Sequence, residues 1–186
     1  IGEESPLSVT QMLWVNLIMV TFAALTLASL PPAKTVMDEK PRSVNEHILK
    51  DMGVEILGVG GIFTVILLGI CVYFQHTNIT CLTDIFDGTA VWGDNDGLSA
   101  YELGLFFTIF VMLQFWNLFN AKTFMTNDSA FKGISWKNTK WFIIIALVIF
   151  VGQVLMTEIP GLQEMFNVAQ GGIKFVDWVI IIGSTS

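Results

Sequence analysis

The sequence contains four apolar runs, each long enough to cross a lipid bilayer as a helix. A spanning helix needs about 20 predominantly apolar residues, because it rises only about 1.5 Å per residue. The runs cover approximately residues 12–30, 54–74, 103–119 and 141–156, and a shorter fifth run covers 175–183. The sequence therefore predicts an all-α, polytopic transmembrane helix bundle with four full spans and a truncated fifth.

Composition excludes the main alternatives to a membrane protein. Apolar residues make up 53% of the 186 residues and charged residues only 13%, against roughly 25% charged residues in a typical soluble domain. The formal net charge of −7 has the wrong sign for a nucleic-acid-binding protein, which neutralises phosphates with Lys and Arg. The stretches between the runs are too short to form a soluble core of their own. We therefore expect the lipid bilayer, and no nucleic acid, among the partners of this chain.

Basic residues mark one side of the predicted membrane. The loops at 31–51 and 121–140 contain eight of the nine Lys and Arg residues, whereas the loop between the second and third runs contains four Asp residues. Cytoplasmic loops of membrane proteins are enriched in Lys and Arg. We therefore expect both basic loops in the cytoplasm, and the N-terminus and the acidic loop outside.

Uncharged polar residues lie inside two of the runs. Asn16 lies in the first run, and Gln114, Asn117 and Asn120 follow at intervals of three residues in the third. This spacing places the three amides on one face of a helix. Amide oxygens can bind hard cations such as calcium, but hydrogen bonding between helices is the more ordinary use of amides in a membrane. The residues alone leave both interpretations open.

Two further expectations concern packing and water. The acidic residues Glu102, Glu158 and Asp177 lie near the ends of runs, where we expect water to reach them. The second run contains Gly58, Gly61 and Gly69, and small residues of this kind allow a neighbouring helix to approach closely.

Two segments resemble the plasma-membrane-type calcium-transporting P-type ATPases. Residues 5–32, SPLSVTQMLWVNLIMVTFAALTLASLPP, are similar to the sixth transmembrane helix of that family, and residues 110–124, FVMLQFWNLFNAKTF, are similar to the eighth. The resemblance implies that residues 1–186 form the C-terminal transmembrane domain of such a pump, from the sixth helix to the start of the tenth. The sequence looks bacterial, so we expect an inner (plasma) membrane location.

The resemblance also implies an ion site. The sixth helix of the family supplies an Asn and, four residues later, an Asp, and these positions are Asn16 and Val20 here. The family's ligand position on the eighth helix is Gln114. Asn16 and Gln114 are therefore the expected metal-ligating residues. Val20 offers neither an oxygen nor a charge, so the sequence departs from the family pattern at the ion site itself.

The implied function is that of a membrane fragment of a calcium-translocating ATPase, with calcium as the transported ion and the N-terminal part of the pump as partner. ATP and magnesium would bind only to domains outside these residues, so we expect no catalytic residue in the chain. The alternative is a non-catalytic membrane scaffold or assembly module derived from such a pump, acting with another membrane protein. Val20 favours this alternative.

Overall fold

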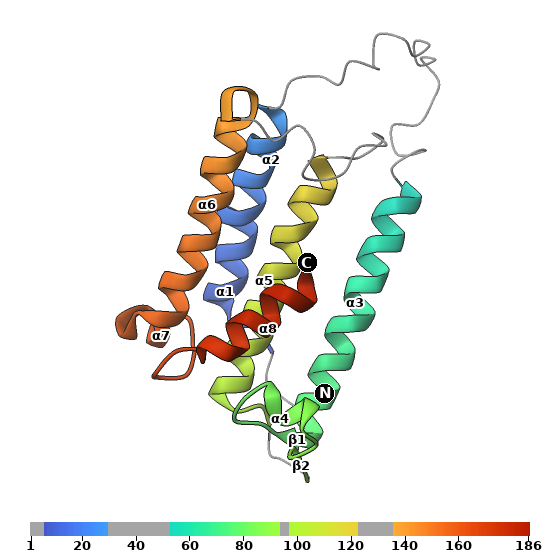
Figure 1. Cartoon of the computed structure of the whole chain (residues 1–186), viewed down its shortest axis with the longest axis vertical. Helices are drawn as coiled ribbons and strands as arrows, with labels where there is room; N and C mark the ends of the chain where they lie inside the picture. Colours follow the sequence, from blue (N-terminus) through green and yellow to red (C-terminus); the bar gives the residue numbers. More distant parts are fainter. Residues whose placement is uncertain (1–5, 30–52, 94–96, 123–135) are drawn as a thin grey trace.

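A computed structural model describes residues 6–29, 53–93, 97–122 and 136–186, and it shows a bundle of helices (Figure 1). The first membrane helix consists of three consecutive segments, α1 (Val9–Leu13), the π-helix η1 (Trp14–Met19) and α2 (Val20–Ala28). Ser8 caps its start, because the Ser8 hydroxyl accepts from the Gln11 N–H and the Gln11 side chain accepts from the Ser8 N–H. Together the three segments are long and apolar enough to cross a membrane.

Three other helices are long and apolar enough to cross a membrane: α3 (Gly53–His76), α5 (Ala100–Lys122) and α6 (Trp136–Glu158). After α6 come the short α7 (Pro160–Met165) and the apolar α8 (Phe175–Thr185). Between α3 and α5 lie the two-stranded antiparallel sheet of β1 (Thr77–Asn78) and β2 (Val91–Trp92) and the one-turn helix α4 (Thr83–Phe86). The predicted fold class, four full spans and a shorter fifth apolar helix, is confirmed.

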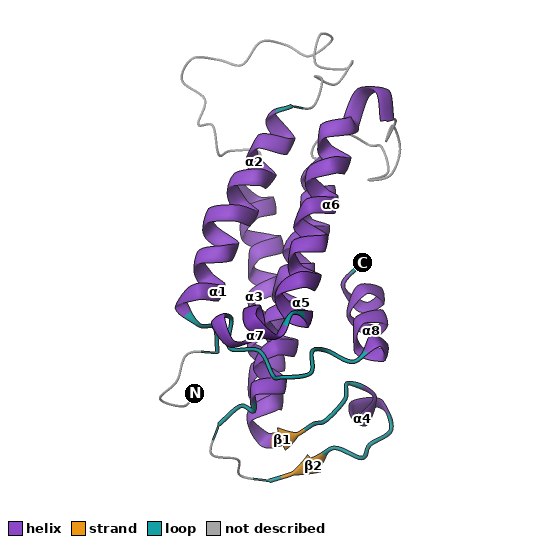
Figure 2. Cartoon of the chain, turned by 90° about the vertical axis from the view of Figure 1, so that its left-hand side faces the viewer, coloured by secondary structure: helices purple, strands orange, loops and turns teal. Residues whose placement is uncertain are grey.

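Helix α5 forms the centre of the bundle, with α3 on one side and α2 and α6 on the other (Figures 1 and 2). Its most apolar stretch is 67% buried, whereas that of α3 is only 6% buried. Large side chains of α5 such as Leu105, Phe107 and Met112 are almost completely buried. This arrangement places the middle of α5 beside the first membrane helix.

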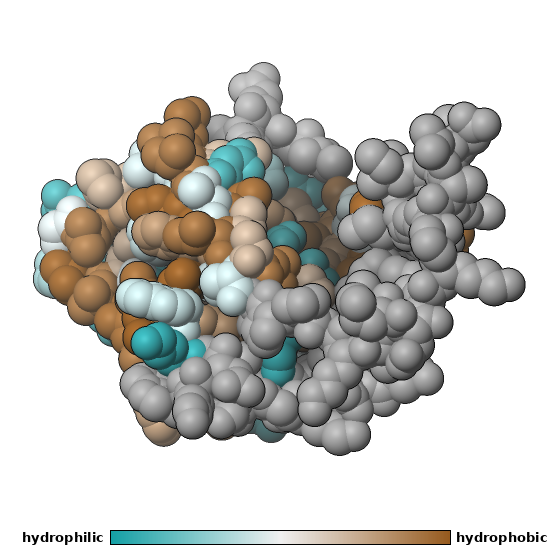
Figure 3. All heavy atoms as spheres, turned by 90° about the horizontal axis from the view of Figure 1, so that it is seen from above, coloured by the Kyte–Doolittle hydropathy of each residue, from teal (hydrophilic) through white to brown (hydrophobic). Residues whose placement is uncertain are grey.

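The outer surface of the bundle is apolar. Large apolar side chains are strongly exposed on several helices, for example Leu57 and Val65 of α3 and Leu147 of α6. The view from above shows apolar residues spread over the outside of the described helices (Figure 3). Such a surface suits a lipid environment, where an exposed apolar side chain has no contact with water.

The two ends of the bundle differ. We call the end that carries β1, α4 and β2 the hairpin end (Figure 1). Helices α2 and α5 end at the opposite end, and α3 and α6 begin there. Both predicted basic loops therefore leave from the end opposite the hairpin, although most of their residues lie outside the described part of the chain.

Glu102 at the start of α5 is buried, with 1% of its surface exposed, which corrects the expectation that water reaches it. Its carboxylate accepts hydrogen bonds from the backbone N–H of Ile79 at 3.1 Å and of Ser99 at 2.8 Å. The segment before α5 folds over the helix start and replaces water with backbone donors. A buried carboxylate is stable when such donors satisfy it.

Asp177 in the first turn of α8 is also buried, so the same expectation is wrong there. It accepts hydrogen bonds from the Cys81 thiol and the Leu82 backbone N–H, both at 2.9 Å, and from the Tyr101 hydroxyl. The hairpin end thus ties α8 to α5 and to the turn before α4. Glu158, at the end of α6, is exposed as expected.

The glycines of α3 do not form a close packing face within the described part of the chain. A Cβ atom added at Gly58, Gly61 or Gly69 would meet no other atom within 4 Å, so the packing expectation is wrong there. Close approach occurs instead at Gly152 of α6, where an added Cβ would lie 2.9 Å from the ring of Trp14. The bundle is tight between the first membrane helix and α6, and open around α3.

Candidate ion site

Asn16, Val20 and Gln114 line one pocket of about 180 Å³ between the first membrane helix and α5. The remaining walls are mainly apolar and include Phe110 and Ile149. The structure therefore brings together both predicted ligands and the position at which the family pattern has Asp.

The π-helix η1 contains Asn16, and Val20 is the first residue of α2. At this junction the Val20 N–H donates to the Val15 carbonyl five residues earlier, which is the hydrogen bond of a π-helix. Asn16 and Val20 still face the same pocket. Asn16 and Val20 therefore lie on the same side of the first membrane helix, although the helix there is wider than an α-helix.

The side-chain amides of Asn16 and Gln114 make no hydrogen bond to any residue that the structure describes. Asn16 is exposed and Gln114 is half-buried. Buried amides elsewhere in the bundle are paired: Gln11 donates to the Phe166 carbonyl and Gln163 donates to the Thr157 carbonyl, both at 2.7 Å. Bonding between helices, the more ordinary use of such amides, is therefore not what occupies Asn16 and Gln114 here.

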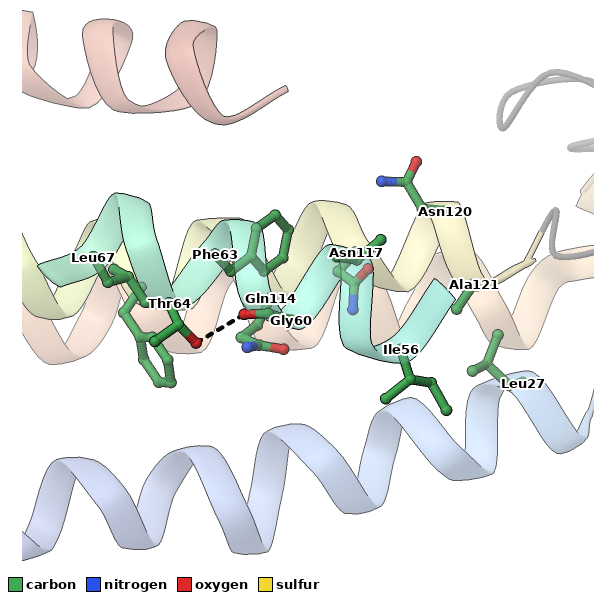
Figure 4. A pocket seen from close by; sticks show the side chains of 12 residues that line it. Leu27, Ile56, Gly60, Phe63, Thr64, Leu67, Gln114, Asn117, Asn120 and Ala121 are labelled. Carbon is green, nitrogen blue, oxygen red and sulfur yellow. Dashed lines mark hydrogen bonds between the residues drawn. The ribbon is translucent and has the colours of Figure 1, made fainter. Parts of the chain in front are cut away.

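A second, larger pocket of about 540 Å³ lies between α2, α3 and α5. Gln114 lines this pocket as well as the smaller one, and Asn117, Asn120 and Thr64 join it there. Figure 4 shows the Gln114 and Asn117 amides turned to the same side of α5, whereas the Asn120 amide points to the other side. The three amides predicted on one face of α5 therefore all line this larger pocket, but their side chains point in different directions.

Thr64 lines the larger pocket although the sequence does not mark it as a site residue. Its hydroxyl donates to the Gly60 carbonyl one turn earlier at 2.8 Å, as threonine commonly does inside a helix. Nothing in the sequence distinguishes Thr64 from a threonine that serves only its own helix. Its place opposite α5 depends on how α3 packs.

No charged side chain among the described residues lines either pocket. Among the described residues, no group of three or more His, Cys, Asp or Glu side chains could hold a metal ion. Calcium is normally held by six to eight oxygens that include carboxylates. Asn16 and Gln114 can therefore supply part of a calcium site, and its negative charge has to come from other residues.

Comparison with known proteins gives a consistent result. The family model described as "Cation transporting ATPase, C-terminus" matches residues 4–186. The chain is 35% identical over 190 residues to calcium-transporting ATPase 2 of Cryptococcus neoformans var. grubii, a match that covers 100% of the chain and 12% of that protein. It is 31% identical over 191 residues to plasma membrane calcium-transporting ATPase 2 of Oreochromis mossambicus, covering 98% of the chain and 16% of that protein.

A third similar protein is plasma membrane calcium-transporting ATPase 1 of Gallus gallus, which is 29% identical over 191 residues. That match covers 98% of the chain and 14% of the relative. The chain thus spans only 12% to 16% of the length of these curated relatives.

Proposed function

Since this chain belongs to the C-terminal membrane family of the cation-transporting ATPases, we propose that it lines part of the cation site of a calcium-transporting P-type ATPase. Asn16 and Gln114 are the proposed ligands. The family and the four membrane helices make the chain an integral membrane protein. Its proposed partner is the rest of the pump, which would bind ATP and magnesium outside these residues.

The observation that carries this proposal is the pocket shared by Asn16, Val20 and Gln114. Two amides without hydrogen-bond partners in the described chain face the same small space, and amide oxygen is a suitable calcium ligand. The names of the relatives point to calcium as the ion. The remaining helices of the bundle would act as the scaffold of the site.

Val20 supports a second candidate function, a membrane scaffold or assembly module that no longer transports ions. A dehydrated divalent cation in a medium of low dielectric constant needs compensating negative charge. Valine supplies none at the position where the family pattern has Asp. In the complete protein we expect Val20 to weaken calcium binding by about 2–4 kcal/mol, or roughly 30-fold to several hundredfold, the cost of losing one partner of a close charge pair.

The test is calcium uptake into vesicles by the complete protein carrying Val20 and by its Val20→Asp variant, at matched expression. Asp at position 20 faces the pocket with Asn16, so uptake should occur at a lower calcium concentration. Leu25→Asp is the matched control, because Leu25 is exposed on the same helix and does not line this pocket. Equal uptake by the Val20 protein and the Val20→Asp variant would show that the site does not include position 20. Absence of uptake by both would favour the scaffold.

We also propose that the N-terminus and the hairpin end lie on the extracytoplasmic side of the membrane and that the loops at 31–51 and 121–140 lie in the cytoplasm. The described helix ends support this, because both loops leave from the same end of the bundle. A bacterial inner (plasma) membrane stays a prediction. The relatives reported above come from a fungus and two vertebrates.

Cysteine labelling from outside intact cells tests the orientation. In a background with Cys71→Ala and Cys81→Ser, an impermeant reagent should modify Asp94→Cys but neither Lys40→Cys nor Lys137→Cys. Asp94, Lys40 and the Lys137 side chain lie outside the described part of the structure. Labelling at positions 40 and 137 with protection at 94 would reverse the proposed orientation.

A further inference from the structure

Helices α6 and α8 enclose a groove of about 470 Å³, which we call the α6–α8 groove. One wall consists of Phe150, Val154 and Glu158, which follow at intervals of four residues on α6. The facing wall includes Trp178 and Ile182, also four residues apart, on α8. Residues four apart lie on the same face of a helix, so each wall is a continuous ridge. Figure 2 shows α8 rising from the hairpin side toward the middle of the bundle, where it packs mainly against α5.

The groove is polar at one end and apolar along the rest of its length. Glu158 is the last residue of α6 at the hairpin end, and Phe150 lies eight residues deeper in the same helix. At the rise of an α-helix this separation is about 12 Å. The groove therefore combines a carboxylate near the expected membrane surface with aromatic and aliphatic walls that extend into the expected hydrocarbon region. A phospholipid has the same order of polarity, with a polar headgroup above an acyl chain.

One oxygen of the Glu158 carboxylate makes no hydrogen bond among the described residues, and it lies against Gly172. Oε1 accepts from the Trp178 indole N–H at 3.1 Å and from the Ile173 backbone N–H at 3.4 Å, and Oε2 makes no hydrogen bond within the described residues. No basic side chain of the described part pairs with Glu158. The nearby Lys174 instead donates from Nζ to the Thr80 carbonyl at 2.7 Å and lies over the Tyr101 ring.

We propose that the α6–α8 groove binds a phospholipid with a primary ammonium headgroup, such as phosphatidylethanolamine. The ammonium group donates to Oε2 of Glu158, and one acyl chain lies along Phe150, Val154 and Ile182. An ammonium group supplies a positive partner for this carboxylate and a hydrogen bond to the oxygen that has none among the described residues. The indole of Trp178 lies beside the headgroup, where tryptophan is enriched at membrane surfaces.

The experiment measures lipid binding to the purified complete protein in detergent by native mass spectrometry. The probes are phosphatidylethanolamine and phosphatidylglycerol with identical acyl chains. We expect the chain to bind phosphatidylethanolamine about tenfold more tightly, the scale of one charge-assisted hydrogen bond. Glu158→Gln should abolish this preference while keeping an acceptor for Trp178 and Ile173. Glu164→Gln is the matched control, because Glu164 is an exposed carboxylate on α7 outside the groove, and it should keep the preference.

A second variant tests the contribution of the apolar walls to lipid binding separately from that of the Glu158 charge. Ile182→Trp fills the groove without touching Glu158 and should weaken binding of both lipids. Free phosphoethanolamine, which has no acyl chains, should not compete at concentrations at which the lipid is bound. Three results would overturn the proposal: equal binding of the two lipids, a preference that survives Glu158→Gln, or competition by free phosphoethanolamine as strong as by the lipid.

Discussion

Tyr101, at the start of α5, donates a hydrogen bond to the buried carboxylate of Asp177 in α8, 76 residues later in the chain. The same carboxylate accepts from the Leu82 N–H at 2.9 Å. One side chain therefore joins three segments that are distant in sequence. A buried carboxylate with several donors contributes more to the stability of the fold than a surface one, because its removal leaves those donors buried without a partner.

Asp177→Ala should lower the free energy of unfolding by about 2–4 kcal/mol, since each donor left unsatisfied costs about 1–3 kcal/mol. The measurement is thermal unfolding of the chain in detergent. Asp87→Ala is the control, because Asp87 is exposed at the same end of the bundle and should change the free energy by less than about 0.5 kcal/mol. Equal effects of the two substitutions would show that the Asp177 hydrogen bonds do not stabilise the fold.

Gly152 and Gly69 predict opposite responses to the same substitution. A Cβ at Gly152 would lie 2.9 Å and 3.1 Å from two ring carbons of Trp14, so Gly152→Ala should destabilise the bundle by about 1–3 kcal/mol through overpacking. A Cβ at Gly69 meets nothing within 4 Å. Gly69→Ala should therefore be neutral or stabilise α3 by up to about 1 kcal/mol. Thermal unfolding of both variants checks the difference in sign, and a loss of stability at both positions would contradict it.

Asp84 gives the hairpin end a defined response to acid. Hydrogen bonds from the Thr80 backbone N–H and then from the Thr80 hydroxyl lower the pKa of Asp84. Because the folded pKa is depressed, the stabilisation is complete above the unfolded pKa of about 3.9 and is lost as the pH falls through the folded pKa. NMR shifts of the Thr80 and Cys81 amides should therefore titrate with a midpoint below 3.9.

Two variants check that Asp84 causes this titration. Asp84→Asn should abolish it, and Thr80→Ala should move the midpoint back toward 3.9, the ordinary Asp value, because the hydroxyl donor is lost. A midpoint that stays the same in Thr80→Ala would show that the hydroxyl does not contribute.

Gln153 and Gln163 are both buried but differ in their partners. The Gln153 carbonyl oxygen has no hydrogen-bond partner in the part of the chain that the structure describes, and its amide nitrogen reaches the Thr108 hydroxyl only at 3.4 Å. Gln163 donates to the Thr157 carbonyl at 2.7 Å. Gln153→Leu should therefore leave stability unchanged or raise it, whereas Gln163→Leu should lower it by about 1–3 kcal/mol. Thermal unfolding ranks the two variants, and the reverse order would contradict the assignment.

The membrane helices could be predicted from the sequence because the bilayer imposes a minimum apolar length on every spanning helix. The placement of Asn16 and Gln114 in one pocket was also predictable, because the resemblance places both residues at an ion site. The π-helix at Trp14–Met19 could not be predicted. No residue pattern in this apolar segment distinguishes hydrogen bonds to the fifth residue back from the usual α-helical bonds to the fourth.

The buried carboxylates show where prediction from local sequence fails. Glu102 and Asp177 lie at helix starts, which usually face water, and their burial depends on donors from the segment at 79–82. The spacing of Ser99 and Glu102 is a capping-box signal that predicts only the local part of this arrangement. The contact of Asp177 with Cys81 and Leu82 has no such signal, because it joins residues about a hundred positions apart in the chain.

The position of Asp177 sets an order for assembly during synthesis. All three of its donors, Cys81, Leu82 and Tyr101, leave the ribosome before α8 does. Helix α8 can therefore complete its contacts only where the turn before α4 and the start of α5 have formed. A defect in that turn would leave both the Asp177 carboxylate and the apolar face of α8 uncovered. A change in the segment at 81–82 would therefore affect the packing of the last helix of the chain.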